Sequence, residues 1–173
     1  MIKTLKYIGI LVIFWSCKDQ ATKQQQVAKK PEMYITTKHT AFLPLLKTSK
    51  KGIGAWNEYT QVSEKLQKFL TISATEALDE ALQLSDNIKK LKDSIRPKEL
   101  QNASFKTRIH VLENEALRLK DMTYIVSISA KEVNHQVDKI LEAFSATNSK
   151  INTVYSQLEV EKEILLKEEI TKQ

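Results

Sequence analysis

The sequence predicts an all-α protein, and the architecture that it favours is an elongated antiparallel three-helix bundle with coiled-coil-like seams. Residues 55–173 contain no glycine and only one proline, so little in this stretch interrupts a helix. Within it, apolar residues recur in alternating steps of three and four, which is the spacing of a coiled-coil seam. The alternative that fits these observations is a long helical hairpin that dimerises.

The first apolar stripe predicts a first helix that ends at Pro97, because proline stops a helix or begins the next one. Three successive steps of four between Val62 and Ala74 are expected to unwind the supercoil locally. Trp56, just before the stripe, is expected to cover the end of the core. The stripe comprises Tyr59, Val62, Leu66, Leu70, Ala74, Ala77, Ala81, Leu84, Ile88, Leu91 and Ile95.

The second apolar stripe is longer and keeps a strict three-four alternation. At the average apolar content of 42%, about seven of its 17 positions would be apolar, whereas 14 are. The pattern therefore indicates a helix that is buried along one side. The stripe comprises Ile109, Leu112, Ala116, Leu119, Thr123, Val126, Ala130, Val133, Val137, Ile140, Phe144, Thr147, Ile151, Val154, Leu158, Glu161 and Leu165.

Two chain paths fit the second stripe. A single helix from Lys98 to Ile170 would be roughly 105 Å long, and the shorter first helix would cover only half of it, so the remainder would need a second chain. A turn in the polar stretch Ser145–Asn152 would instead let a third helix fold back. The unbroken register through Thr147 favours the hairpin. Apolar residues outside the stripes favour the bundle, since a wide apolar face contacts two neighbours; these are Leu78, Leu82, Ile125 and Ile128.

The first 17 residues have the order of an export signal. Lys3 and Lys6 precede an apolar run, Tyr7–Trp15, which is followed by a small residue, Ser16, and by Cys17, the only cysteine in the chain. The stretch Ile13-Phe14-Trp15-Ser16-Cys17 resembles the signals of bacterial lipoproteins that the type II signal peptidase cuts. With bulky Phe14 and Trp15, and with Lys18-Asp19 after the cysteine, the pattern is similar to that of Bacteroidota lipoproteins.

The resemblance implies cleavage before Cys17, a diacylglyceryl group on its sulfur and acylation, with palmitate for example, of the new amino group. Two or three chains anchor a protein stably where one does not. The expected organisation is a signal peptide at 1–16, a lipidated cysteine with a basic tether and a short apolar segment at 17–54, and a helical domain at 55–173. Because Lys18, and not an aspartate, follows the cysteine, we expect the lipid anchor to lie in the outer membrane, on either its periplasmic or its surface face.

Charge is divided unevenly along the chain. Residues 18–51 carry eight lysines against Asp19 and Glu32, whereas residues 52–173 carry 17 basic against 19 acidic side chains. The basic balance therefore belongs to the signal and the tether, and it does not indicate nucleic-acid binding, which needs a basic face on a folded domain. The apolar segment between Met33 and Leu46 is expected to dock on the helices as a cap or to serve as a partner-binding peptide.

Signals of catalysis and of metal binding are few, and the sequence predicts neither an enzyme nor a cofactor or metal site. Lipidation uses the only thiol, and the helical domain has no glycine-rich phosphate loop. Glu132 and His135 form one Glu-x-x-His pair, but a di-iron bundle needs a second pair and further glutamates. The heptad count places His135 and His110 on the outside, and His39 lies in the linker.

Two features are candidates for binding. Small residues of the two stripes are expected to face each other, where they either let the helices pack closely or leave a groove for an apolar helix or an acyl chain. The acidic end, residues 159–169, is a solvated helix end or an electrostatic partner site, and Glu161 on the seam is expected to fray it. The residues of the candidate groove are Ala74, Ala77, Ala81, Ala116, Thr123 and Ala130.

These features predict a lipid-anchored extracytoplasmic helical protein that acts through protein contacts, as an envelope scaffold, an accessory subunit or a surface module, with a homodimer as one form. The alternative is a helical lipoprotein that binds a small apolar or lipid ligand. A cell-wall tether is disfavoured, because such lipoproteins end in a lysine, whereas Lys172 is followed by Gln173.

Overall fold

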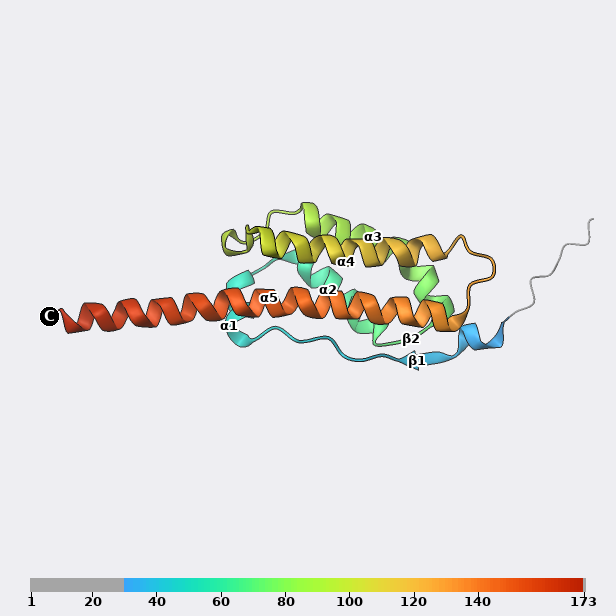
Figure 1. The fold of residues 1–173 in the computed structure, drawn as a ribbon, viewed down its shortest axis with the longest axis horizontal. Helices are drawn as coiled ribbons and strands as arrows, with labels where there is room; N and C mark the ends of the chain where they lie inside the picture. Colours follow the sequence, from blue (N-terminus) through green and yellow to red (C-terminus); the bar gives the residue numbers. More distant parts are fainter. Residues whose placement is uncertain (1–29, 173) are drawn as a thin grey trace, which may run out of the picture.

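The computed structural model describes residues 30–172, and in this range the chain is mainly α-helical, which confirms the all-α prediction. Five α-helices follow two short segments at the start, and two three-residue strands form the one sheet of the described range (Figure 1). In chain order the elements are η2 (Pro31–Tyr34), β1 (Thr36–Lys38), α1 (Lys47–Ile53), α2 (Asn57–Phe69), β2 (Thr71–Ser73), α3 (Ala74–Asp93), η3 (Lys98–Leu100), α4 (Ala103–Met122) and α5 (Ala130–Thr171).

The first apolar stripe is divided between two helices, so the prediction of one helix up to Pro97 is wrong. The break falls in the run of four-residue steps, where α2 ends at Phe69 and β2 pairs antiparallel with β1. Ser73 then begins α3 with a capping box, in which its side chain accepts from the Glu76 backbone and the Glu76 carboxylate accepts from the Ser73 backbone. The run of four-residue steps therefore coincides with the end of α2, and not with a locally unwound coiled coil as expected.

The second stripe is divided as well, but not where the sequence suggested. α4 ends at Met122 and α5 begins at Ala130 behind a second capping box, formed by Ser129 and Glu132. The intervening loop is residues 123–129, which is one heptad long, so the three-four count passes through it without a change of phase. The predicted turn at Ser145–Asn152 is wrong, because α5 is continuous through it.

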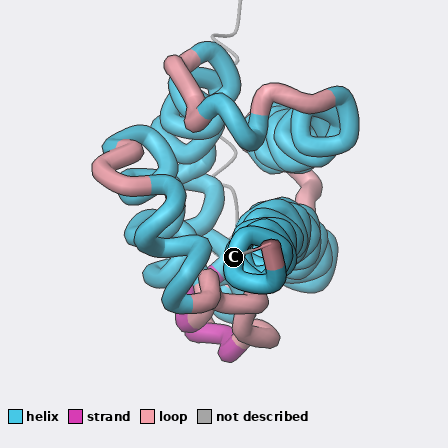
Figure 2. Tube along the Cα trace, turned by 90° about the vertical axis from the view of Figure 1, so that its left-hand side faces the viewer, coloured by secondary structure: helices cyan, strands magenta, loops and turns pink. Residues whose placement is uncertain are grey.

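The helices pack around one core. α3, α4 and α5 contact one another in pairs, α2 packs on α3, and α1 packs on α5 (Figures 1 and 2). Trp56 covers one end of the core as expected: it is 5% exposed, stacks on Tyr59 and donates from Nε1 to Ser94 Oγ at 2.9 Å. Large fully buried side chains come from α2 to α5, among them Phe69, Leu84, Phe105 and Phe144.

α5 is much longer than its neighbours and runs past the end of the core. Its last buried residue is Tyr155, and every residue from Glu159 to Lys172 is exposed. Figure 1 shows this part of the helix projecting from the bundle toward the C-terminus. The hairpin alternative required an exposed seam from Ile140 onward, but Ile140, Phe144 and Ile151 are fully buried, and of the apolar seam residues of α5 only Leu165 is exposed.

Candidate functional site

Residues 39–46, which we call the strap, run along α5 without regular secondary structure and are held there by side chains of that helix (Figure 1). Ser145 Oγ accepts a hydrogen bond from the Leu43 backbone N–H at 2.9 Å, and the Asn148 amide donates to the Leu43 carbonyl at 2.8 Å. Asn152 accepts from the backbone N–H of Leu46 at 2.9 Å and donates to the carbonyl of Pro44 at 3.0 Å. These three side chains thus satisfy backbone N–H and carbonyl groups of the strap, as a neighbouring strand would in a sheet.

The spacing of Ser145, Asn148 and Asn152 explains why one face of α5 binds the strap. Steps of three and four residues put all three side chains on the same side of a helix. In the sequence analysis a turn was predicted for this polar stretch, because the side chains of serine and asparagine commonly form hydrogen bonds with their own backbone in turns. Here Asn148 and Asn152 are buried and satisfied by the strap instead, which lets the helix continue.

His39 fastens the other end of the strap. Its Nδ1 donates to Asp138 Oδ1 at 2.7 Å, its backbone N–H donates to the carbonyl of Leu70 at 2.9 Å, and its side chain is 1% exposed. A His–Asp pair orients an imidazole as in a general base. The Nε2 atom of His39 is buried, however, and has no hydrogen-bond partner among the described residues. The His39–Asp138 pair therefore has no nucleophile to activate among those residues.

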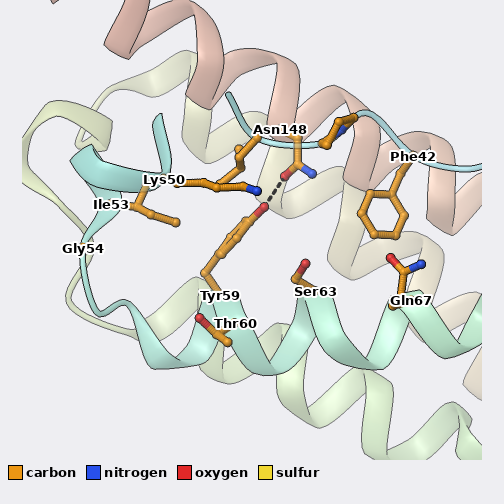
Figure 3. A pocket seen from close by; sticks show the side chains of 11 residues that line it. Phe42, Lys50, Ile53, Gly54, Tyr59, Thr60, Ser63, Gln67 and Asn148 are labelled. Carbon is orange, nitrogen blue, oxygen red and sulfur yellow. Dashed lines mark hydrogen bonds between the residues drawn. The ribbon is translucent and has the colours of Figure 1, made fainter. Parts of the chain in front are cut away.

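A cavity of about 360 Å³ lies behind the strap, between the strap, α1 and α2 (Figure 3). Tyr59 donates from its hydroxyl to Asn148 Oδ1 at 2.8 Å, and burial raises the pKa of Tyr59 above its ordinary value, so the phenol stays neutral. Lys50 extends over the cavity, and Ser63 and Phe42 form part of its wall. These mixed walls suit water or a small hydrogen-bonding molecule better than an acyl chain.

A larger open groove of about 810 Å³, which we call the terminal groove, lies where the strap meets the exposed part of α5. Its apolar walls are Leu43, Leu46 and Val160, which are 44%, 51% and 55% exposed. Its remaining lining comes from small and polar side chains of α5 between Ser149 and Glu161. The terminal groove therefore combines apolar walls with a hydrogen-bonding floor.

The exposed end of α5, residues 159–171, which we call the tail, carries apolar side chains that no other described residue covers. They are exposed by 51% to 74%, although residues of this size are usually buried. The glutamates of the predicted acidic end lie among them, with Glu161 fully on the surface. The exposed apolar residues of the tail are Val160, Ile164, Leu165, Leu166 and Ile170.

A second group of exposed apolar residues, which we call the tether-end patch, lies at the opposite end of the molecule. It combines the loop between α4 and α5 with the segment that follows the tether. The Lys30 ammonium donates to the carbonyl of Ile128 at 2.8 Å and so joins the two segments. The patch consists of Tyr34, Ile35, Tyr124, Ile125 and Val126, exposed by 58%, 64%, 77%, 47% and 80%.

The residues of the groove predicted between small side chains lie mostly inside the core. Ala74, Ala77 and Ala81 of α3 are fully buried, Ala116 is 1% exposed and Ala130 is 8% exposed. By contrast, the sixth residue, Thr123, caps α4 and is exposed. A ligand at this position stays a prediction, and the terminal groove was not anticipated, because it depends on where the strap lies.

The predicted lipidation site, Cys17, and residues 18–29 of the tether precede the described range. Within residues 30–172, no group of three or more His, Cys, Asp or Glu side chains is placed to hold a metal ion, and His110 and His135 are exposed. No helix in that range is long and apolar enough to cross a membrane. No protein-family model, curated protein or solved structure matches the chain.

Proposed function

We propose that this chain is a lipid-anchored helical protein of the cell envelope that acts by binding another protein. The observation that carries the proposal is the tail, in which five large apolar side chains extend past the core on one helix. A cluster of large apolar side chains on an exposed helix end is a mark of an interaction site. The lipobox-like sequence before Cys17 supports the anchor.

The arrangement of the molecule suits this role. Lys30, where the described chain begins, lies beside the start of α5, and the tail lies at the far end of that helix. A helix of 42 residues is about 63 Å long. An anchor at Cys17 therefore presents the tail away from the lipid surface. We take α3, α4 and α5 as an elongated antiparallel three-helix bundle that keeps the two ends apart.

The anchor is proposed to lie in the outer membrane, on its periplasmic or its surface face. The intact mass of the protein purified from its native membrane tests this part. An acylated mass that disappears in a Cys17→Ser variant is expected, and protease treatment of whole cells then decides between the two faces. An unmodified full-length mass would overturn the anchor.

The protein contact is tested separately by photo-cross-linking in cells. A photoreactive amino acid at Ile164, in the tail, is expected to give one discrete cross-linked product, whereas the same amino acid at Leu82, 54% exposed on α3, is expected to give none. Mass spectrometry of the product distinguishes a second copy of this chain from another envelope protein. A tail that cross-links no more than position 82 refutes the proposed contact.

A second candidate function is the binding of a small apolar or lipid ligand in the terminal groove. The groove volume of about 810 Å³ lies within the range of small-molecule sites, and Leu43 and Leu46 give it apolar walls. Native mass spectrometry of the purified protein is expected to show a bound lipid that a Leu46→Glu variant loses. A wild-type protein that never carries a ligand rules out this function.

A further inference from the structure

We propose that the tether-end patch is a membrane contact, in which Tyr34, Ile35, Tyr124, Ile125 and Val126 lie among the lipid headgroups of the surface that holds Cys17. The inference rests on the lipid anchoring proposed above and adds an orientation to it. The folded domain then stands on the membrane by this end and does not swing freely on its tether.

The exposure of these side chains is unusual for their positions. The loop between α4 and α5 places three large apolar residues in succession, Tyr124 to Val126, and two of them are at least 77% exposed. Loops of water-soluble proteins mostly carry polar and turn-forming residues. Tyr34 and Ile35 belong to a segment about 90 residues earlier in the sequence, and their side chains are 58% and 64% exposed.

Several contacts bring these two segments to the same end of the molecule. Lys30 bonds to the carbonyl of Ile128 at the end of the loop, and Asn134 in the first turns of α5 donates to Thr37 Oγ1 at 2.9 Å. Figure 1 shows η2, β1 and the loop before α5 together at the end opposite the tail. The two segments that carry the patch therefore lie at the same end of the molecule.

The length of chain outside the described range identifies the occupant as a lipid surface. Twelve residues separate Cys17 from Lys30, and the 13 steps from one residue to the other span at most about 45 Å. An acylated Cys17 would therefore hold the tether-end patch near the bilayer, whereas the tail, at the other end of a helix of about 63 Å, points away from it. Short tethering raises the local concentration of the lipid surface at the patch.

The chemistry of the patch favours headgroups over a charged partner. Tyrosine is enriched at membrane interfaces, where its ring lies in the apolar layer and its hydroxyl stays hydrated. The charges of residues 30–35 and 120–132 cancel, because three lysines face three carboxylates; these are Lys30, Lys120 and Lys131 against Glu32, Asp121 and Glu132. The contact is therefore apolar insertion, which high salt does not weaken.

The test uses the full acylated protein in vesicles of phosphatidylethanolamine and phosphatidylglycerol. Since acylation occupies the only native cysteine, a Ser127→Cys substitution supplies one free thiol inside the patch without removing any of its five members. An environment-sensitive fluorophore on this thiol is compared with one at Ile95→Cys, 95% exposed in the connection between α3 and α4. Lipids with spin labels near the headgroup report contact by quenching.

The label at position 127 is expected to be quenched at least twofold more than the label at position 95, in low salt and in 1 M NaCl alike. Adding Tyr124→Ser and Val126→Ser to Ser127→Cys is expected to return the quenching to the level of position 95. Equal quenching at both positions, a contact that salt abolishes, or a label that is shielded from water without lipid quenching each overturns the proposal. An acylated protein with an unquenched label rejects the patch but leaves the anchor standing, whereas an unacylated mass rejects both.

Discussion

Tyr59 of α2 donates its hydroxyl hydrogen to Asn148 of α5 across 2.8 Å, and both side chains are almost completely buried. Asn148 in turn donates to the Leu43 carbonyl of the strap at 2.8 Å. One asparagine of α5 therefore joins the strap and α2, which lie about 90 to 105 residues before it in the sequence. The strap is consequently part of the folded core, although it has no regular secondary structure.

We predict that Asn148→Ala destabilises the protein by about 2–3 kcal/mol, because it leaves the buried Tyr59 hydroxyl without its acceptor and the Leu43 carbonyl without its donor. The free energy of unfolding in urea measures the loss. Thr153→Ala on the same helix is the control, since its exposed hydroxyl bonds only to the carbonyl of Ser149. A cycle with Tyr59→Phe is expected to give a coupling energy above about 0.5 kcal/mol.

A methyl group at Gly52 is expected to displace α1 from α5. A Cβ atom there would overlap the ring of Tyr155, which is 8% exposed and has little room to move. We expect Gly52→Ala to cost about 1–3 kcal/mol in unfolding free energy. The ring is the cause if a Tyr155→Leu background reduces this cost, and an equal cost in both backgrounds would show that the ring is not the obstacle.

Acid is expected to weaken the starts of α3 and α5. Hydrogen bonds from Ser73 lower the pKa of Glu76, and those from Ser129 lower the pKa of Glu132. Both carboxylates therefore contribute stability above the ordinary glutamate value of 4.5, and this contribution is lost as the pH falls through their lower folded-state values. Glu132→Gln should flatten the decline of the urea midpoint between pH 6 and 3, whereas Glu161→Gln in the tail should leave the decline unchanged.

Alkali is expected to act through two buried phenols, those of Tyr59 and Tyr155. Burial raises the pKa of Tyr155 to about 12, and burial also raises that of Tyr59. Because the tyrosine ionises near its ordinary pKa of 10 in the unfolded chain, the stability from Tyr155 is complete below pH 10 and is lost as the pH rises toward 12. Phenolate absorbance should show this late ionisation, and Tyr155→Phe should remove its share. A Tyr155 that ionises at pH 10 in the folded protein contradicts the prediction.

Removal of the tail is expected to abolish binding of the partner while the stability of the bundle stays almost unchanged. A chain that ends at Leu158 keeps every buried residue of α5 and also Leu158, which packs against the core, so its free energy of unfolding should change by less than about 0.5 kcal/mol. The same truncation should abolish co-purification of the partner that cross-links to position 164 of the full chain. A large loss of stability would mean that the tail packs on the bundle, contrary to the exposure of its residues.

The helical class and most of the buried positions could be predicted from the sequence, because apolar periodicity records burial directly. The helix ends could not. The loop at residues 123–129 is one heptad long and left the phase unchanged, so Val126 counted as a seam residue although it is 80% exposed. The polar stretch around Asn148 looked like a turn, because its partner is the strap, about 105 residues earlier in the chain.

The candidate surfaces were harder to anticipate for the same reason. The terminal groove exists only where the strap meets α5, and no local pattern fixes that meeting. The side chains that hold the strap did leave a signal, since Ser145, Asn148 and Asn152 follow helical spacing. In this protein, asparagines at such spacing belong to a helix that binds an extended segment. The tail was anticipated only in part, because the hairpin alternative required an exposed seam, and of the five exposed apolar residues of the tail only Leu165 lies on that seam.

The direction of the strap has a mechanical consequence. From Lys30 the chain runs along α5 toward the tail, and the hydrogen bonds to Ser145, Asn148 and Asn152 cross between strap and helix along that path. A force that pulls Lys30 along the helix axis, away from the tail, loads these bonds together, in shear. A force across the axis would break them one after another. The protein is therefore strongest against tension that is aligned with its own length.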